Sequence, residues 1–306
     1  MWANFLLCVV CSSAFINPAP QTSELLQKAN SYWKINFEEE ISTLPRFREF
    51  CENHDYFTRS LHTSSSPCNG VTSNILRGGE FAGPIAKSGV DGQFVRALGF
   101  FGGLPATPRI NYHADKRLSF INELQKPESL STFQQELHDV LRLKEGPDLF
   151  KSLGEHQSSP TGWEQITLIN HFSEQTDSTA LFPKTMRLLD EHCGERLGPR
   201  HTAIARQLPH SGIAEHNDLY NWMSTLHLPL LHENENGGRV GLIVSGEKGT
   251  IDWEVGVASV MDTSFSHSTY NNSPTPMYLL LVDFFHIDLS QEEVRAIKKF
   301  FKDNSK

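Results

Sequence analysis

The C-terminal half of the chain is a succession of short apolar runs separated by turn residues, and this pattern limits the fold more than any other feature. Gly, Asn, Pro and Ser fall between the runs. Runs of this length and spacing are typical of strands in a β-sandwich or a double-sheet jelly roll. We therefore predict a mainly β fold with flanking helices. The predicted strands cover residues 163–170, 201–208, 222–231, 238–244, 256–261 and 276–285.

Helices are predicted on both sides of the strand-rich region. Apolar residues recur at helical spacing over residues 24–53 and between residues 120 and 141, where the second of two short helices is expected after Ser131. A further helix over residues 182–192 has a proline at its start. The last helix is expected to begin at Ser290–Glu293, which has the sequence of a capping box.

The first residues of the chain are predicted to form a signal peptide. Trp2–Cys11 is a short apolar run, and the small residues Ser12–Ala14 that follow are suited to cleavage. The run is too short to cross a membrane and no later one is long enough, so we expect no membrane span in the mature chain. We expect entry into the secretory pathway, to the endoplasmic reticulum lumen or the exterior. The alternative is a secondary plastid, because Ser13–Phe15 resembles the Ala-Phe junction of bipartite plastid presequences.

We divide the chain into three parts on this basis. The signal peptide covers residues 1–14, a helical and loop-rich extension covers residues 15–105, and the main domain covers residues 106–306. A formal charge of −9, from 27 basic and 36 acidic residues, argues against nucleic acid as a partner. We expect a peptide or a small molecule instead.

Three cysteines remain after removal of the signal peptide, namely Cys51, Cys68 and Cys193. An odd number excludes a fully paired set of disulfides within the mature chain. The spacing does not decide whether Cys51 pairs with Cys68.

Histidines followed two positions later by an acidic residue are the candidates for a metal site. Such pairs are common by chance in a chain with 14 histidines and 36 acidic residues. Three occur, at His113/Asp115, His216/Asp218 and His286/Asp288. Only His216 and Asp218 lie between predicted strands and are followed by a histidine at another strand edge, His267. Two imidazoles and a carboxylate on one face of a metal are the ligand set of non-haem Fe(II) oxygenases.

This assignment has competing readings. His267 lies in a Ser- and Thr-rich stretch and is about equally well explained as a surface loop residue. A zinc site remains open because imidazole and carboxylate also suit zinc. For His210 and His232 we favour a structural role.

Several motifs occur in the same order and at the same spacing as in a known family. They are Trp163–Leu168, Phe182–Leu189, Leu208–Asp218, Leu226–Leu230, Trp253–Gly256, Met261–His267 and Leu281–His286. On these motifs, residues from about 105 to 300 resemble the aspartyl/asparaginyl β-hydroxylases. The resemblance implies a double-stranded β-helix (a jelly-roll, cupin-like core) and a dioxygenase that depends on Fe(II) and 2-oxoglutarate. It also implies hydroxylation of an unactivated C–H bond, in Asp or Asn side chains of a peptide or in a small molecule.

The resemblance also implies the roles of individual residues. An alignment without gaps places the metal ligands at His216, Asp218 and His267, and leaves Pro209–Gly212 as the turn before them. These three residues would form the catalytic centre. His227 matches a family histidine near the cosubstrate.

The chain departs from the family where the cosubstrate would be anchored. The family holds the far carboxylate of 2-oxoglutarate with an arginine ten residues after the distal histidine, and this position is Met277. A second family arginine falls on Thr225. A buried carboxylate needs a replacement donor. We predict His227, Thr225 and Ser224 as cosubstrate-binding residues. Other possible donors are Tyr278, Arg206, Arg239 and Lys248.

Three hypotheses remain open at this point. The first is an active hydroxylase with a relocated carboxylate anchor, which we favour because the metal ligands are retained. The second is a metal-binding jelly-roll protein or pseudoenzyme that no longer uses 2-oxoglutarate. The third is a different metal-dependent cupin-like enzyme, such as a hydrolase or a dioxygenase without a keto acid.

Overall fold

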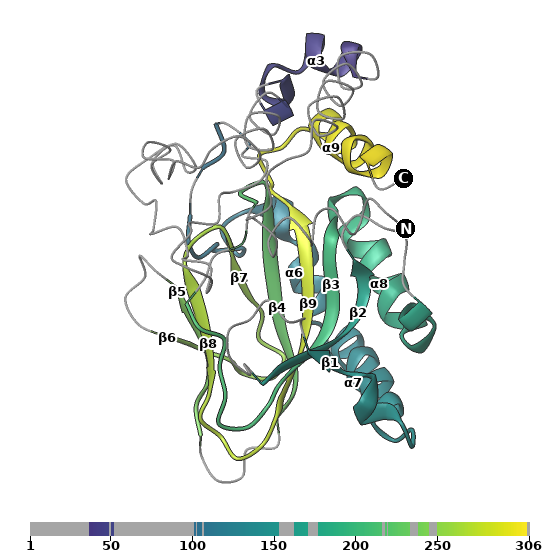
Figure 1. Cartoon of the computed structure of the whole chain (residues 1–306), viewed down its shortest axis with the longest axis vertical. Helices are drawn as coiled ribbons and strands as arrows, with labels where there is room; N and C mark the ends of the chain where they lie inside the picture. Colours follow the sequence, from purple (N-terminus) through teal and green to yellow (C-terminus); the bar gives the residue numbers. More distant parts are fainter. Residues whose placement is uncertain are drawn as a thin grey trace, which may run out of the picture.

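The computed structural model shows a β-barrel-like core with helices along one side and at one end (Figure 1). No helix among the described residues is long and apolar enough to span a membrane. The structure describes residues 37–48, 50–51, 101, 103–105, 107–152, 162–170, 177–215, 218, 220–232, 238–244 and 250–304.

Two sheets form the core of the described chain. The larger sheet has the strand order β1-β2-β3-β9-β4-β7, and the smaller has the order β6-β5-β8. All strand pairs are antiparallel. This is the double-stranded β-helix predicted from the resemblance. The strands are β1 (Lys151–Ser152), β2 (Trp163–Asn170), β3 (Leu197–Gln207), β4 (Met223–His232), β5 (Val240–Val244), β6 (Thr250–Asp252), β7 (Ser259–Met261), β8 (His267–Asn271) and β9 (Met277–Phe285).

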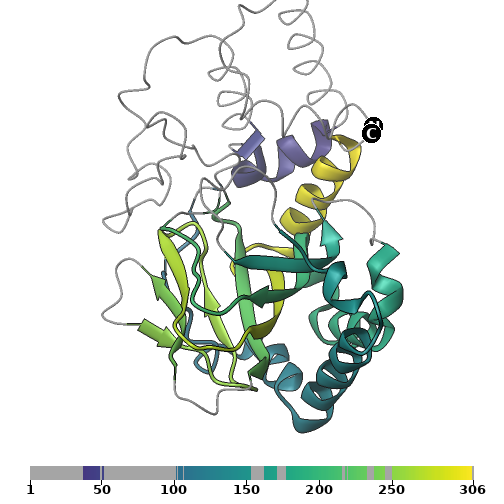
Figure 2. The same cartoon turned by 60° about the horizontal axis from the view of Figure 1, so that its bottom comes forward.

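The helices gather on the outer face of the larger sheet and at one end of the barrel, as Figure 2 shows. α7 begins with a proline. Proline is tolerated at the first helical position because an N–H there would have no partner within the helix. The helices are α3 (Glu38–Thr43), α6 (Phe120–Leu124), α7 (Pro127–Leu141), α8 (Pro183–Cys193) and α9 (Gln291–Asn304), with 3-10 turns η1 (Lys116–Leu118), η2 (Gly146–Leu149), η3 (Asp177–Leu181) and η4 (Gly194–Arg196).

Side chains alternate between the two faces of each strand of the larger sheet. On β4, Leu226, Leu228 and Leu230 point outward and are buried in one hydrophobic cluster with α6, α7 and α8. A second cluster lies between the two sheets and joins residues of β5, such as Leu242, to residues of β9, such as Leu281. Apolar side chains of both sheets therefore pack against one another in the described part of the barrel interior.

A third cluster ties the N-terminal extension to the barrel. Phe50 is fully buried and contacts Phe101, Trp222 of the segment before β4, and Phe300 of α9. α3 and α9 lie side by side above the strand ends in both views (Figures 1 and 2). The described residues of the predicted extension thus share a hydrophobic core with the predicted main domain.

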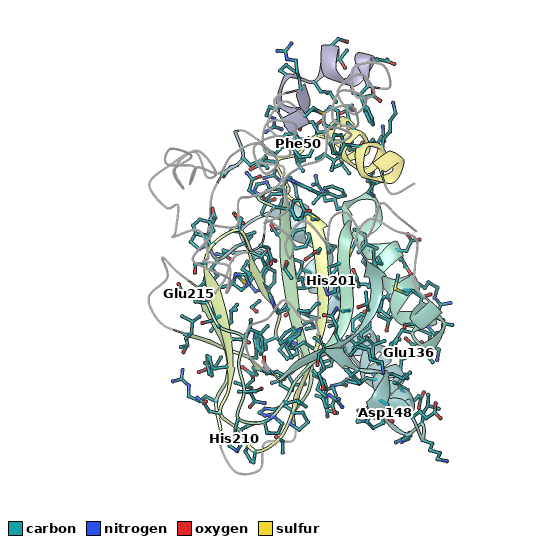
Figure 3. The ribbon with its side chains drawn as sticks, viewed as in Figure 1. Phe50, Glu136, Asp148, His201, His210 and Glu215 are labelled. Atoms are coloured by element: carbon teal, nitrogen blue, oxygen red, sulfur yellow. The ribbon has the colours of Figure 1, made fainter. Side chains whose placement is uncertain are left out.

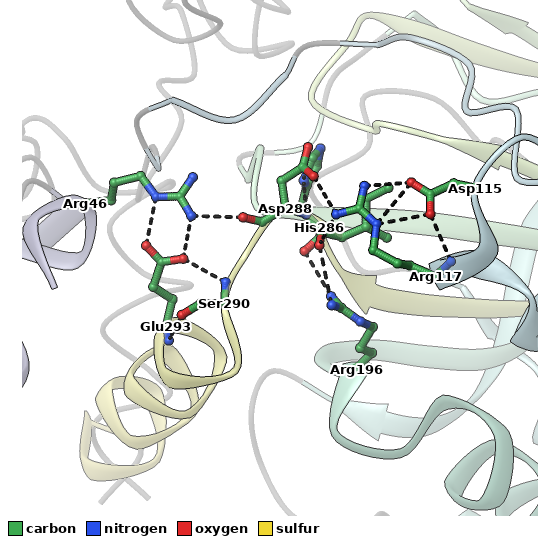
Figure 4. Close-up of polar contacts among 9 residues, drawn as sticks. Arg46, Asp115, Arg117, Arg196, His286, Asp288, Ser290 and Glu293 are labelled. Carbon is green, nitrogen blue, oxygen red and sulfur yellow. Dashed lines mark hydrogen bonds and ion pairs between the residues drawn. The ribbon is translucent and has the colours of Figure 1, made fainter.

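Polar contacts reinforce this junction (Figure 4). The Arg46 guanidinium donates to both carboxylate oxygens of Glu293, at 2.8 and 2.5 Å, and to the main-chain oxygen of Asp288 at 2.9 Å. The same Glu293 carboxylate accepts from the main-chain N–H of Ser290 at 2.8 Å, and the Ser290 hydroxyl accepts from the Glu293 N–H at 3.1 Å. The predicted capping box at the start of α9 is confirmed.

The elements differ from the predicted ones in several places. α7 begins at Pro127 rather than after Ser131, because proline favours the first helical turn. β3 begins at Leu197, four residues before the predicted strand, and β1, β6 and β8 were not predicted. Much of the helix predicted over residues 24–53, nearly all of the loop region 58–106, and the signal peptide lie outside the described residues.

Candidate functional site

The inner face of β4 carries two of the predicted site residues, Thr225 and His227. Both are buried, and they alternate with the leucines that face the helices. The His227 ring stacks on the indole of Trp253, with 5.7 Å between ring centroids and 22° between ring planes. Trp253 belongs to the cluster between the sheets, so His227 faces the barrel interior.

Ser224 lies on the opposite face of the same strand. Its pairing partner on β9, Phe284, packs in the cluster beneath the helices. Leu226, two residues further along β4 and on the same face as Ser224, packs there too. Among the described residues its hydroxyl has no hydrogen-bond partner. Alternation along β4 therefore separates Ser224 from Thr225 and His227, and Ser224 is left out of the site proposed below.

His267 and Asp218 both lie close enough to His227 to affect it electrostatically. The pKa of His227 falls to about 3, mainly because the ring is buried and in part because His267 lies nearby, while Asp218 acts in the opposite direction. His227 is therefore neutral near pH 7, so it can offer a hydrogen bond but no positive charge. Its Nδ1 atom has no hydrogen-bond partner among the described residues.

The ring of His267 is held in one tautomer. Its Nδ1 atom lies 2.8 Å from the main-chain oxygen of Phe265. A carbonyl oxygen can only accept, so Nδ1 carries the proton of the neutral ring and Nε2 carries the lone pair. This arrangement is the one that prepares a histidine to ligate a metal through Nε2.

The segment before β4 is fastened to the turn before β8 on both sides of residue 216. The Ser266 hydroxyl donates to the Glu215 carboxylate at 2.7 Å. The main-chain N–H of Asp218 donates to the oxygen of Thr263 at 2.8 Å. Residues 216 and 217 lie outside the described residues, so the position of the His216 side chain stays a prediction. Within the described part of the chain, which omits His216, no three His, Cys, Asp or Glu side chains are grouped to hold a metal ion.

Thr225 makes a hydrogen bond that the sequence does not suggest. Its hydroxyl donates to the Asp283 carboxylate at 2.6 Å, and both residues are buried. Asp283 pairs with Thr225 in the β4–β9 register, two residues along β9 from Leu281, which pairs with His227. A buried carboxylate thus lies beside Thr225, the position where the family resemblance implies a guanidinium.

The remaining position for a cosubstrate anchor is apolar. Met277 is fully buried in the cluster between the sheets, together with Leu279 and Trp163. Among the residues whose side chains the structure describes, no lysine or arginine is buried. The described barrel interior therefore has no lysine or arginine that could bind the far carboxylate of 2-oxoglutarate.

The other proposed donors lie elsewhere. Arg206 pairs with Glu164 and lies over the ring of Phe150, on the side of the sheet that faces the helices. Tyr278 packs against the same phenylalanine. Arg239 pairs with Asp252 on the surface. Lys248 lies outside the described residues.

His210 and His232, for which a structural role was predicted, lie apart from this site. His210 is exposed, has a left-handed backbone conformation (φ 52°), and lies at the lower end of the barrel, well below Glu215 (Figure 3). His232 at the end of β4 contacts the Ser273 hydroxyl at 2.9 Å.

Sequence reasoning did not single out Asp283, Asp262 or the Phe265 carbonyl. Asp283 could have been found, because it is the one charged residue in the apolar run that forms β9. The contribution of a main-chain oxygen leaves no signal in the sequence.

The sequence profile described as "Aspartyl/Asparaginyl beta-hydroxylase" matches residues 128–287, which is more than half of the chain. The chain belongs to the aspartyl/asparaginyl β-hydroxylase family. The matched region runs from α7 to the end of β9, and so it contains every predicted metal ligand.

Individual members of the family match over a limited length. The aspartyl/asparaginyl β-hydroxylases of Mus musculus and Homo sapiens are each 25% identical over 151 residues, which are 49% of this chain. The matched region is 20% of the mouse protein and 19% of the human protein, so the chain spans about a fifth of their length.

Solved structures share the fold at low similarity. A prolyl-4-hydroxylase from Pseudomonas putida gives a TM-score of 0.35 at 13% identity, covering 55% of this chain and 97% of that one. A 2OG-Fe(II) oxygenase family oxidoreductase from Burkholderia pseudomallei gives a TM-score of 0.37 at 12% identity, covering 56% of this chain and 92% of that one.

Proposed function

We propose that this protein is a hydroxylase whose catalytic Fe(II) is held by His216, Asp218 and His267. The observation that carries the proposal is the His267 ring, fixed with Nε2 as the lone-pair nitrogen, in a family barrel where His267 and Asp218 both lie near His227. Imidazole and carboxylate are suitable Fe(II) donors, so the described part of the donor set fits the metal.

Each residue of the site would have a distinct task. Bound Fe(II) would supply the activation of O2 that hydroxylation of an unactivated C–H bond requires. His216, Asp218 and His267 would hold the ion, and a set of three protein ligands would leave positions free for substrate and cosubstrate. His227, neutral and buried, would orient a ligand by hydrogen bonding. The apolar side chains beside it, including Trp253, would exclude water from the reacting centre.

The proposed cosubstrate is 2-oxoglutarate, as the family resemblance implies. The described residues do not fit its far carboxylate, because none of them places a cation in the barrel and Asp283 adds a negative charge nearby. A carboxylate buried without a donor costs several kcal/mol. If 2-oxoglutarate is used, its anchor must therefore come from residues other than Thr225 and Met277.

This mismatch favours one alternative function. The chain would be a metal-binding jelly-roll protein or pseudoenzyme that keeps the metal ligands but no longer uses 2-oxoglutarate. The specific support is the apolar packing of Met277 and the hydrogen bond from Thr225 to Asp283.

The biological setting is part of the proposal. We expect an Asp or Asn side chain of a peptide, or a small molecule, as the substrate. We expect the secretory pathway as the location, with a secondary plastid as the alternative.

Anaerobic titration of the purified protein tests these statements in two steps. Fe(II) binding is measured first for the wild type and for His216→Ala, Asp218→Ala and His267→Ala. Each variant should lose more affinity than the about 10- to 100-fold that removal of an outer-shell partner costs. The matched control is His210→Asn, because asparagine tolerates the left-handed conformation and this side chain lies away from the site. Unchanged affinity in the three variants, or a loss in the control, would contradict the assignment.

The second step is addition of 2-oxoglutarate to the Fe(II) form. A visible charge-transfer band indicates chelation of iron by the keto acid and supports the hydroxylase. Absence of the band while Fe(II) stays bound supports the alternative function.

A further inference from the structure

The turn between β7 and β8, residues 262–266, contacts the metal-ligand segments at three points. The Phe265 oxygen faces Nδ1 of His267 at 2.8 Å. The Thr263 oxygen accepts from the Asp218 N–H at 2.8 Å, and the Ser266 hydroxyl donates to Glu215 at 2.7 Å. A single five-residue turn thus contacts two predicted ligands and the neighbour of the third.

Asp262 organises this turn from within. Its Oδ1 atom accepts from the Ser264 N–H at 2.9 Å and from the Ser264 hydroxyl at 2.5 Å. Its main-chain oxygen accepts from the Phe265 N–H at 3.1 Å, and its own N–H donates to the Pro108 oxygen at 3.2 Å. Asp262 is only 3% exposed, so water competes little for these bonds. The Asp262 side chain thus bonds to Ser264, the residue just before Phe265, whose carbonyl faces His267.

We propose that Asp262 is a positioning residue for the metal centre, acting through the Thr263 and Phe265 carbonyls. This inference rests on the proposed function, because it assigns His267 and Asp218 as ligands. Asp262 fixes the turn, the turn fixes the His267 tautomer and the Asp218 main chain, and the ligands are thereby set before a metal arrives. Outer-shell partners that orient ligating histidines commonly contribute 10- to 100-fold to metal affinity, roughly.

The first measurement uses the metal-free protein and so does not depend on metal binding. A long-range ¹H–¹⁵N correlation spectrum reports which ring nitrogen of each histidine carries the proton, and His267→Gln identifies the His267 signals. Wild-type protein should show His267 protonated at Nδ1. Asp262→Ala should show a mixture of tautomers, and Asp262→Asn should restore the wild-type pattern, because the amide oxygen can still accept from Ser264.

The second measurement is Co(II) affinity with the visible spectrum of the bound ion. Asp262→Ala should bind Co(II) about 10- to 100-fold more weakly and with an altered spectrum. Asp262→Asn should stay within about threefold of the wild type, since it keeps the acceptor. The control for general destabilisation is Glu136→Ala, which removes a buried carboxylate at the junction of α7 and α8 and should leave Co(II) binding unchanged.

The outcomes separate this inference from the proposed function. Wild-type affinity and spectrum in Asp262→Ala, or a wild-type His267 protonated at Nε2, would overturn the positioning role. If His267→Gln itself binds Co(II) normally, the metal site proposed above is wrong, whatever the tautomer. Equal losses in Asp262→Ala and Glu136→Ala would show that Asp262 acts only on stability.

Discussion

Phe50 tests whether the N-terminal extension is a structural part of the barrel domain. Its ring is fully buried and lies 5.7 Å from Phe101, 6.1 Å from Trp222 and 5.2 Å from Phe300, measured between ring centroids. Replacing a buried phenylalanine by alanine costs about 3–5 kcal/mol, which includes the transfer of the ring and the cavity left behind. Because Trp222 and Phe300 belong to the barrel domain, we expect Phe50→Ala to lower the stability of the whole domain by about 4 kcal/mol, a value within this range.

The assay is urea unfolding followed in parallel by tryptophan fluorescence and far-ultraviolet circular dichroism. A shared core predicts one cooperative transition in which both signals move together to lower urea. At about 2–4 °C for each kcal/mol in a domain of this size, the same change corresponds to a fall in Tm of roughly 10 °C. Leu143→Ala is the control, since this leucine is 48% exposed and its truncation should change stability by no more than about 0.5 kcal/mol.

Two results would refute the reasoning. One is a loss of less than about 1 kcal/mol, which would mean that the Phe50 ring contributes little to the core. The other is a separate early transition that leaves the main transition at the wild-type urea concentration. That result would mean that residues 37–51 unfold independently of the barrel.

Two further perturbations probe the rest of the domain. Glu136 of α7 accepts hydrogen bonds from the N–H and the hydroxyl of Thr185 at the start of α8, each at 2.8 Å. Glu136→Ala should therefore lower the free energy of unfolding, measured in urea, by about 3 kcal/mol. Glu136→Gln should lower it less, because the amide keeps one acceptor oxygen. Burial raises the pKa of the Cys193 thiol to about 12 from its ordinary 9.0, so the unfolded chain loses this proton at lower pH than the folded one. Stability should therefore fall as the pH rises from about 9 towards 12, and Cys193→Ala should show a shallower fall in pH-dependent unfolding. An equal slope in the two proteins would show that Cys193 does not titrate in this way.

The sequence predicted the strands whose inward face is apolar. β2 and β9 lie where apolar runs predicted them, within a residue at each end, because burial of a continuous apolar strand leaves a run that can be read directly. The helix ends were predicted as far as they depend on local chemistry. The capping box at Ser290 and Glu293 formed as expected, since both partners lie within one turn of helix.

β8 was not predicted because its buried face is polar. His267, Thr269 and Asn271 alternate inward, and hydrogen bonds to other segments replace the apolar contacts that a pattern search relies on. A residue of this kind is stable in the interior only when its partners are in place. For Thr269 and Asn271 those partners include Ile213 and Gln207, which are more than 50 residues away in the chain.

The sequence by itself determined the family, the fold class, and the residue types available to bind a metal. Tertiary structure decided how those residues are used. It set which face of β4 lies toward the barrel interior, paired Thr225 with Asp283, and directed the Phe265 carbonyl at His267. The physical reason is that strand alternation and local helix signals act between neighbours in the chain, whereas the environment of a buried polar group depends on which distant segments pack against it.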